Sequence, residues 1–388
     1  MSTFDEVINR RNTCCAKWDM TKDGELPMWV ADMDFQTAPQ ITNALIERAK
    51  HGVFGYALKG DEWYKAYKNW WSTRHHFNIE KEWLMFCTGV IPALSSIVRK
   101  LTTPAENVVV MTPVYNHFFS SILNNGRNVL ESKLKYENGE FDIDFKDLEE
   151  KLSNPQTTMM ILCNPHNPIG KIWNKATLEK IGNMCCENHV IVVSDEIHCD
   201  IVEPEKEYIP FASISEKCKN NRITCVSPTK TFNIAGLQTA AILVPDEGLR
   251  NRVNRAINTD EVAEPNVFAA IAPVVAYNEG GEWLDELNKY LWENRKFAEN
   301  FIKENIKVVF PIKAEATYLM WVDCTSVSTN SEELCDFIRE KTGLFVTSGD
   351  VYRNADGFMR VNIACPRSLL EDGLNRLKTG IEQYLLAK

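Results

Sequence analysis

The sequence predicts an α/β protein in which a mostly parallel, doubly wound sheet forms a large domain and a smaller α+β domain follows it. Six short apolar runs, rich in β-branched residues, alternate with helical patterns between residues 83 and 244. Several of these runs are continuously apolar, which is typical of strands buried on both faces. After residue 281 the order changes to a long helical stretch, short strands and a further helix, as in α+β domains.

The strands expected in the large domain are separated by helical patterns. Leu178, Ile181 and Met184, for example, are spaced to form one buried helical face. Strands that alternate with helices favour a parallel sheet covered on both sides. The expected strands span residues 83–87, 108–111, 159–163, 190–193, 223–226 and 240–244.

The sequence divides into three parts. The first fifty residues contain few periodic segments, and we expect them to pack on the smaller domain. The expected parts are an N-terminal segment, a large domain and a small domain, over residues 1–50, 51–281 and 282–388. The elements expected in the small domain are helices over 282–305 and 331–341, and strands near 308 and over 318–322 and 358–365.

Composition excludes several classes of protein. The 388 residues are 44% hydrophobic and 25% charged, which is ordinary for a globular chain. The net charge is −10 and no basic patch is visible, so we expect no nucleic-acid partner. No apolar run approaches the roughly 20 residues that cross a bilayer, so we expect no membrane partner either.

The cysteines and histidines give no pattern typical of a metal site. Twelve cysteines occur without a C-x-x-C spacing, and no secretory signal pattern opens the chain. Reduced thiols and a cytoplasmic location are therefore expected. His117 and His166 lie near the expected cleft without a metal-ligand spacing, and the pairs at 70–71 and 75–76 are expected to pack in the core.

Polar residues follow the strands of the expected sheet, where ligands bind in open α/β folds. Gly89 permits a tight turn and Pro92 suits a first helical turn, so the free N–H groups there could hold a phosphate. Tyr115 follows the next run and could stack on a flat ligand or pack at the rim. Residues 164–170 (NPHNPIG) hold two Asn-Pro pairs, which present amide side chains to the cleft.

Acidic residues and a lysine follow the next two strands. Asp195 and His198 come after a buried run, where burial is costly without a ligand or partner; the alternative is that Asp195 caps a helix. Lys230 lies among small polar residues, and desolvation there would lower its pKa and make it an amine nucleophile. A phosphate site, an aromatic face, an amide, a carboxylate and an amine are together what pyridoxal phosphate requires.

The same segments resemble a known family. Residues 164–170, 194–198 and 227–237 resemble the fold-type I pyridoxal-phosphate enzymes of the class I/II aminotransferase-like superfamily. Residues 27–35 and 360–367 look like signatures of its cystathionine β-lyase or C–S lyase branch, the MalY/PatB type. The resemblance covers nearly the whole chain and implies an aminotransferase-like fold whose large domain binds pyridoxal 5'-phosphate.

The resemblance implies a role for each residue near the cofactor ring. Lys230 would hold the cofactor covalently and act as the catalytic base. Asp195 would face the pyridine nitrogen and raise its proton affinity. Asn167 and His198 would lie near the phenolic oxygen, and Tyr115 would stack on the ring.

The resemblance also implies how phosphate is bound and how subunits assemble. The phosphate would be held by Gly89, Val90 and Ser227, with Thr229 joining them. Tyr56 matches a tyrosine that family members extend to the partner subunit's phosphate. The resemblance therefore implies a homodimer with active sites at the subunit interface.

Arg360 is expected to bind the substrate. Met359 and Val361 share one face of the expected strand, whereas Arg360 and Asn362 share the other and can point to the cleft. A guanidinium binds a carboxylate through two parallel hydrogen bonds. By resemblance, Arg360 would hold the α-carboxylate of a sulfur amino acid.

The activity implied is a pyridoxal-phosphate-dependent C–S β-lyase that cleaves cystathionine or related S-substituted L-cysteines to a thiol, pyruvate and ammonia, as in methionine biosynthesis. The alternatives are an aminotransferase and a non-catalytic binding protein on the same scaffold. Gln238, where aminotransferases commonly carry arginine, favours the lyase. Residues 351–353 (VYR) replace a usual Phe-Gly pair, which leaves the substrate open. A nicotinamide dehydrogenase fits poorly because no G-x-G-x-x-G follows the first strand.

Overall fold

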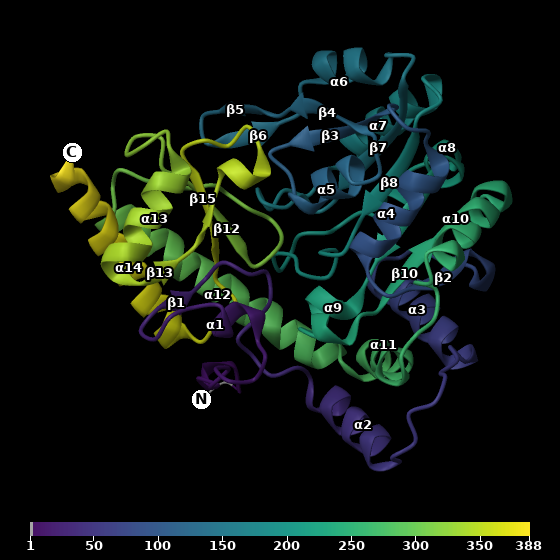
Figure 1. Ribbon diagram of the computed structural model, residues 1–388, viewed down its shortest axis with the longest axis horizontal. Helices are drawn as coiled ribbons and strands as arrows, with labels where there is room; N and C mark the ends of the chain where they lie inside the picture. Colours follow the sequence, from purple (N-terminus) through teal and green to yellow (C-terminus); the bar gives the residue numbers. More distant parts are fainter. Residues whose placement is uncertain (1–2) are drawn as a thin grey trace.

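The computed structural model describes residues 3–388 and contains a seven-stranded sheet in one half of the molecule (Figure 1). The strand order is β2-β10-β9-β8-β7-β3-β4. β10 is antiparallel to both of its neighbours, and the remaining pairs are parallel, which confirms the mostly parallel sheet. The strands are β2 (Leu84–Cys87), β3 (Asn107–Thr112), β4 (Asn128–Lys133), β7 (Thr157–Cys163), β8 (Ile191–Asp195), β9 (Arg222–Val226) and β10 (Ala240–Leu243).

Each of the six apolar runs forms a strand, with ends shifted by a few residues. The first run is shorter than expected, because residues 81–83 form a 3₁₀ turn before β2. The sequence pattern missed β4, which is the edge strand of the sheet and has mostly exposed or half-buried side chains. An edge strand covered on one side needs no continuous apolar run, so its sequence carries a weaker signal.

Helices cover both faces of this sheet, as a doubly wound fold requires. Val108 and Val110 of β3 pack with the helices α4 and α10 on one face. Val109 and Met111 point to the other face and pack with α6 and α7. The helices of the two faces are α4 (Val90–Leu101), α5 (His117–Leu123) and α10 (Glu247–Thr259), and α6 (Phe145–Leu152), α7 (Lys175–Glu187) and α8 (Glu216–Asn220).

Aromatic residues fill the core at the end of the sheet next to β2. Trp70 and Trp71 of α3 (Asp61–Arg74) are buried, and both contact Tyr277 of α11 (Val267–Glu279). The expectation that this tryptophan pair packs in the core is therefore confirmed. α9 (Pro228–Thr231) lies beside this cluster through Phe232, whose ring faces Trp70.

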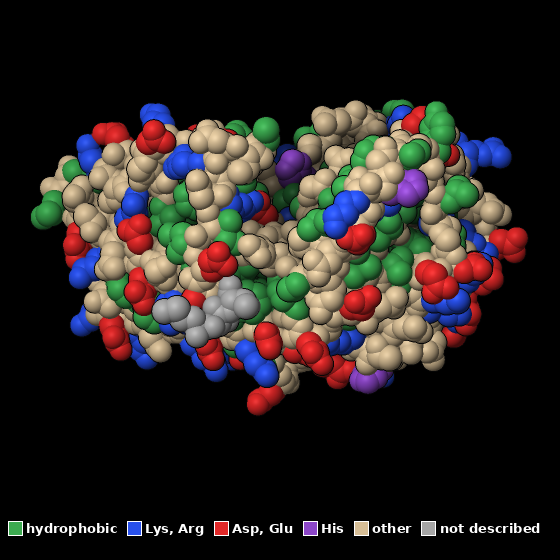
Figure 2. Space-filling view, turned by 90° about the horizontal axis from the view of Figure 1, so that it is seen from below, with side chains coloured by type: hydrophobic (Ala, Val, Ile, Leu, Met, Phe, Trp, Pro, Cys, Tyr) green, Lys and Arg blue, Asp and Glu red, His purple; other side chains and the backbone are tan. Residues whose placement is uncertain are grey.

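A second, four-stranded antiparallel sheet lies in the other half of the molecule (Figure 1). Its order is β11-β12-β15-β14. β15 ends at Asn362, three residues earlier than expected. Figure 2 shows the surface notched between the two halves, with acidic and basic side chains interspersed. The elements of this half are α12 (Gly281–Asn305), β11 (Phe310–Pro311), β12 (Leu319–Asp323), α13 (Ser331–Thr342), β13 (Leu344–Phe345), β14 (Thr347–Ser348), β15 (Phe358–Asn362) and α14 (Arg367–Ala387).

The N-terminal fifty residues contact both halves. β1 (Leu26–Pro27) pairs in parallel with β13 of the second half. α2 (Pro39–Lys50) was not expected, and it packs against α11 instead. Its sequence gives little signal because Ile41 is its one buried residue. The domain boundaries near residues 50 and 281 remain predictions.

Within residues 3–388, no helix combines the length and the apolar composition that a membrane span requires.

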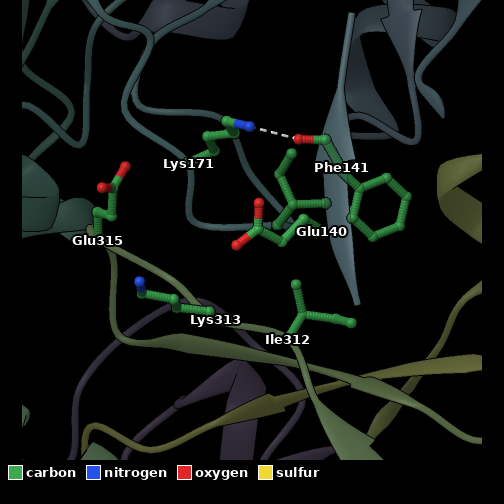
Figure 3. A pocket seen from close by; sticks show the side chains of 7 residues that line it. Glu140, Phe141, Lys171, Ile312, Lys313 and Glu315 are labelled. Atoms are coloured by element: carbon green, nitrogen blue, oxygen red, sulfur yellow. Dashed lines mark hydrogen bonds between the residues drawn. The ribbon is translucent and has the colours of Figure 1, made fainter. Parts of the chain in front are cut away.

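Gly170 joins the two halves at a close backbone contact. Its carbonyl accepts hydrogen bonds from the N–H groups of Glu315 (2.8 Å) and Ala316 (2.9 Å). Its φ of +68° is left-handed, and a Cβ atom would lie 2.5 Å from Ala314 Cβ. Figure 3 shows the small cavity beside this contact, where Lys171 donates to the carbonyl of Phe141.

We expect Gly170→Ala to lower the free energy of unfolding by about 1–3 kcal/mol, because it combines backbone strain with a steric clash. Urea denaturation measures this. Gly139→Ala is the matched control, since Gly139 has a φ of +80° and no atom within 4 Å of its added Cβ. Equal destabilisation by the two substitutions would show that the contact with Ala314 contributes nothing.

Candidate active site

The carboxyl ends of the parallel strands border a cavity of about 220 Å³. Most of the residues singled out in the sequence line it, although they come from five separate segments of the chain. Those that do are Gly89, Val90, Tyr115, Asn167, Asp195, His198, Thr229 and Lys230. The sheet topology therefore brings together the polar groups that follow successive strands.

Lys230 lies in the short helix α9, directly after β9. Ser227 caps this helix by accepting the N–H of Thr229 (3.1 Å), which fixes the turn. The Lys230 Nζ donates to the carbonyl of Ala31 (2.6 Å). Burial lowers the pKa of Lys230 to about 8, although the charge of Asp32 and then that of Asp195 oppose this shift. A neutral, nucleophilic amine is therefore accessible near neutral pH.

Asp195 ends β8 and faces the same cavity. Its side chain accepts the N–H of Ile197 (3.1 Å), and residues 196–199 form a turn, so the alternative that Asp195 caps a helix is wrong. Burial raises the pKa of Asp195 to about 7. A cationic ligand beside this carboxylate would restore its charged form.

Glu196, the neighbouring acid, points away from the cavity. It accepts hydrogen bonds from the hydroxyls of Ser194 (2.6 Å) and Tyr208 and from the N–H of Phe211 (3.2 Å). Its hydrogen-bonding capacity is used within the fold, whereas that of Asp195 is available to a ligand.

Three further side chains form the walls of the cavity. His198 is buried, its Nδ1 has no hydrogen-bond partner, and burial lowers its pKa to about 3. Asn167 Oδ1 accepts a hydrogen bond from Arg360 Nη1 (3.2 Å). Burial raises the pKa of Tyr115 to about 12, so its phenol stays neutral. A buried, unpartnered imidazole nitrogen in a cavity is a site for a polar ligand.

One end of the cavity is suited to an anion. The twelve-residue helix α4 begins at Val90, directly after Gly89, and both residues line the cavity. The free N–H groups of a helix N-terminus bind phosphate well. Thr229 lines the same cavity, and its hydroxyl is 2.7 Å from that of Ser227, which lies just behind it.

Arg360 lies in an adjoining cavity of about 450 Å³ that shares Tyr115 and Lys230 with the first. Its side chain is buried, with Nη2 donating to the carbonyl of Trp29 (3.0 Å) and Nε without a partner. The guanidinium lies over the ring of Tyr352, 5.1 Å from its centroid. The strand alternation thus directs Arg360 to the cleft, as expected.

Sequence reasoning missed the segment over residues 29–33, which crosses the two cavities. The carbonyl of Ala31 accepts hydrogen bonds from Lys230 and from the hydroxyl of Tyr318 (3.0 Å). Asn362 Nδ2 donates to the carbonyl of Asp32 (2.6 Å). These contacts use backbone oxygens, which no residue type marks. The one available signal was the resemblance over residues 27–35.

Tyr56 is not brought to the cavity within this chain. It is fully exposed on the segment between α2 and α3, and it lines a different cavity beside Glu264 and Pro265. Figure 1 shows α2 and this segment extending away from the rest of the molecule.

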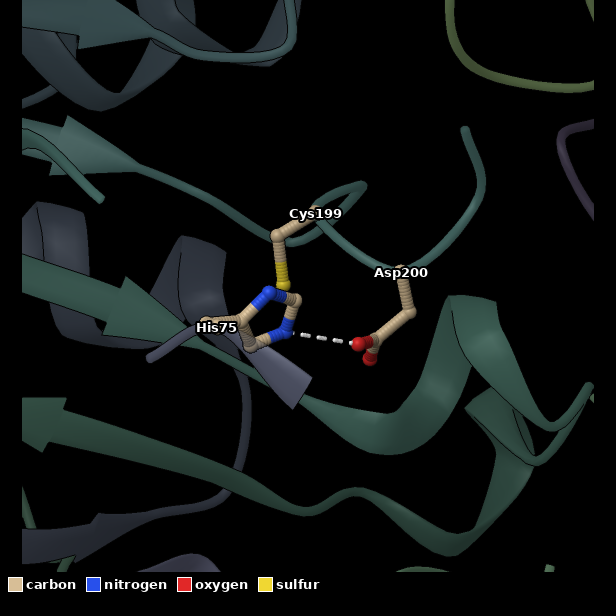
Figure 4. Close-up of side chains that lie close together, drawn as sticks. All are labelled: His75, Cys199 and Asp200. Carbon is tan, nitrogen blue, oxygen red and sulfur yellow. Dashed lines mark hydrogen bonds and ion pairs between the residues drawn. The ribbon is translucent and has the colours of Figure 1, made fainter. Parts of the chain in front are cut away.

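His75, Cys199 and Asp200 lie close together behind α9, within 4.8 Å of one another. Figure 4 shows Cys199 beside one ring nitrogen of His75 and Asp200 beside the other. Asp200 accepts hydrogen bonds from His75 (2.9 Å) and Thr231 (2.8 Å). Since Thr231 follows Lys230, this network helps to fix the position of the lysine.

The groups in the cavity fit pyridoxal phosphate. The helix N-terminus suits the phosphate, and the imidazole of His198, which lines the cavity, suits a polar ring substituent. Asp195 suits a protonated ring nitrogen, and the buried amine of Lys230 can bond to an aldehyde.

Comparison with known proteins supports the same assignment. The model of the family "aminotransferase class I and II" matches residues 28–377. Cystathionine beta-lyase PatB of Bacillus subtilis (strain 168) is 40% identical over 384 residues, covering 97% of this chain and 99% of its own.

Two solved structures share the fold closely. Cystalysin from Treponema denticola, which contains a pyridoxal 5'-phosphate cofactor, is 31% identical with a TM-score of 0.95, covering 98% of each chain. A PLP-bound C–S lyase from Staphylococcus hominis is 32% identical with a TM-score of 0.90, covering 97% of this chain and 98% of its own. The resemblance inferred from the sequence and the aminotransferase-like fold are thereby confirmed. The chain belongs to the aminotransferase class I and II family.

Proposed function

We propose that this protein is a pyridoxal-phosphate-dependent C–S β-lyase that cleaves cystathionine or related S-substituted L-cysteines. The observation that carries the proposal is that Lys230 and Asp195 line one buried cavity and Arg360 lines the cavity that adjoins it. The names of the relatives support it, since one is a cystathionine beta-lyase and another a C–S lyase.

The cofactor, when bound, supplies an electron sink for the charge that remains on the substrate after its α-proton is removed. We propose that Lys230 would hold the cofactor covalently, and that its amine would be free once the substrate's amino group takes its place. The free amine, with its pKa near 8, then removes the α-proton. The β-carbon–sulfur bond breaks, the thiolate leaves, and water converts the remaining aminoacrylate to pyruvate and ammonia.

The other residues position the reactants. Asp195 would keep the ring nitrogen protonated, because an opposite charge raises its proton affinity. Arg360 would bind the α-carboxylate through two parallel hydrogen bonds. Its hydrogen bond to the carbonyl of Trp29 would then be replaced. The remaining proposed cofactor contacts are those of Asn167 and His198 with the phenolic oxygen, of Tyr115 with the ring face, and of Gly89, Val90, Ser227 and Thr229 with the phosphate.

The experiment is to incubate the purified holoenzyme with L-cystathionine and no oxo acid. We expect pyruvate, ammonia and homocysteine in equal amounts, because β-elimination needs no second substrate. Pyruvate is measured by coupled lactate dehydrogenase and homocysteine by thiol titration.

The same assay distinguishes an aminotransferase. A transaminase would release no pyruvate from cystathionine, because it would convert cystathionine to the corresponding oxo acid with the carbon–sulfur bond intact, and it would depend on added oxo acid for further turnover. Sustained turnover that requires the oxo acid would therefore contradict the lyase proposal.

We also propose that the protein is a homodimer in which Tyr56 completes the partner's site. Tyr56 lies beyond the reach of its own cavity, on a segment whose Val53, Phe54 and Leu58 are 62%, 59% and 90% exposed. Several exposed apolar residues on one short segment are typical of an interface between subunits.

A mixing experiment tests this assembly. Tyr56→Ala and Lys230→Ala homodimers are each expected to be impaired, whereas subunits exchanged at equal ratio should recover about a quarter of the wild-type activity, since one site of each heterodimer is intact. Absence of recovery after verified subunit exchange would mean that Tyr56 does not serve the partner.

We further propose that the reaction takes place in the cytoplasm and supplies homocysteine for methionine biosynthesis. The twelve cysteines support a reducing location, because all of them are free thiols in the structure.

A further inference from the structure

The cavity that holds Arg360 is larger than a bound α-carboxylate needs. It has a volume of about 450 Å³ and is continuous with the Lys230 cavity through Ala31, Tyr115 and Lys230. Arg360 is 5% exposed and its Nε has no partner, which indicates an anionic ligand at this end. A cysteine derivative held there by its α-carboxylate must extend its sulfur substituent into the remaining volume.

The wall of that remaining volume is acidic. Glu332 and Asp336 lie one turn apart on α13, and Asp350 comes from the separate 3₁₀ turn over residues 350–352. The other lining residues with a fixed charge are Lys230 and Arg360, at the opposite sign. The lining also contains tyrosines, one thiol and His117. His117 is exposed.

Two of the carboxylates converge from different elements. Cys335 lines the cavity between them, and its pKa is raised to about 12 by burial and then by the charges of Asp350 and Asp336. The carboxylates of two separate elements thus create a negative field in one region of the cavity. The preference of a helix N-terminus for acidic residues does not explain this, because Asp350 does not belong to α13.

The three carboxylates of this wall form no ion pair within the described part of the chain. Over residues 3–388, no ion pair joins a basic side chain to Glu332, Asp336 or Asp350. Arg339 lies near Asp336 on α13, but both of its hydrogen-bonding arms bind Glu25 at 2.9 Å. Asp350 accepts a hydrogen bond from the hydroxyl of Ser348. The charges of the three carboxylates are therefore available to a cationic ligand.

We propose that the enzyme prefers S-substituted cysteines whose leaving thiol carries a positive charge, such as an ammonium group at its far end. This inference rests on the proposed function. The α-carboxylate binds Arg360, and the ammonium of the leaving group is attracted to Glu332, Asp336 and Asp350. Trp29 and Phe345, stacked 4.9 Å apart along the same cavity, cover the alkyl chain between the two charges.

Binding of three amino acids that lack a carbon–sulfur bond tests this preference without turnover. L-Lysine, L-2-aminoheptanoate and L-2-aminoadipate have similar length and end in a cation, a methyl group and an anion. By calorimetry on the holoenzyme we expect L-lysine to bind about three- to tenfold more tightly than L-2-aminoheptanoate, and L-2-aminoadipate to bind most weakly. The preference should shrink in about 0.5 M salt, because exposed charges are screened.

Charge-removing variants identify the source of the preference. In the double variant Glu332→Gln, Asp336→Asn, the ratio of the L-lysine and L-2-aminoheptanoate dissociation constants should fall towards one. Glu340→Gln is the matched control, since Glu340 lies on the same helix, is exposed and does not line the cavity. Equal binding of the three ligands by the wild type, or an unchanged ratio in the double variant, would overturn the proposal.

Turnover separates this inference from the proposed function. S-(2-aminoethyl)-L-cysteine should exceed S-propyl-L-cysteine in kcat/KM for pyruvate release by a similar factor. If neither releases pyruvate but L-lysine still binds preferentially, the lyase function fails and the charge preference stands. If both release pyruvate equally and the three ligands bind alike, the preference fails and the lyase stands.

Discussion

Replacing Lys230 with alanine is expected to reduce kcat for pyruvate release from cystathionine by roughly a thousandfold or more, since a positioned general base alone contributes a large part of such rates. The amine is buried beside Asp195 and Arg360, and no other lysine lines either cavity. Under the proposed function, the substitution removes both the covalent attachment of the cofactor and the base. Initial rates with saturating pyridoxal phosphate measure the effect.

A second measurement separates attachment from folding. Borohydride reduction followed by mass spectrometry should label residue 230 in the wild type and give no label in Lys230→Ala. Lys65→Ala is the control, because Lys65 is exposed and forms an ion pair with Glu62 on the surface. Its kcat should be unchanged. If Lys230→Ala kept a tenth of the wild-type rate, Lys230 would not be the base.

Asp195→Asn is expected to lower kcat by about a hundredfold and to weaken cofactor binding. The amide keeps the size of the side chain but cannot hold a positive charge at the ring nitrogen, where a carboxylate raises the proton affinity by about 1–3 pKa units. The cost of burying Asp195, visible as a pKa raised to about 7, is offset only when a cation faces it. Steady-state kinetics and equilibrium dialysis of pyridoxal phosphate measure the two effects.

The neighbouring acid provides the contrast. Glu196→Gln should lower the thermal midpoint, because Glu196 accepts hydrogen bonds from Ser194 and Phe211 in the core, and should leave kcat nearly unchanged. The assignment of Asp195 would be contradicted if Asp195→Asn retained the wild-type kcat, or if Glu196→Gln lost as much.

The sequence predicted the part of the fold that depends on continuous burial. The central strands are apolar on both faces, so their runs stand out and their order along the chain implies a parallel sheet. The sequence did not predict β4 and α2, because each buries few apolar side chains. β4 is an edge strand, and Ile41 is the one buried residue of α2. Where an element contributes little to the core, its sequence carries little periodicity.

The site was predictable wherever a chemically distinctive side chain follows a strand. Lys230, Asp195 and His198 lie together because parallel strands all end at one edge of the sheet. The contacts of residues 29–33 were not predictable, since they are made by backbone carbonyls that every residue possesses. Tyr56 lies outside the cavity of its own chain, and its proposed role depends on a second subunit.

By itself, the sequence determined the family, the order of the elements and the residues able to perform the chemistry, because motifs and burial periodicity are local properties of the chain. The tertiary structure alone decided the surroundings of these residues: Asp195 lines the cavity, Glu196 bonds within the core, and Arg360 donates to the carbonyl of Trp29. It also decided that Glu332, Asp336 and Asp350 border one cavity. The reason is physical, since charge and hydrogen bonding act over distances in space, and separation along the chain does not fix those distances.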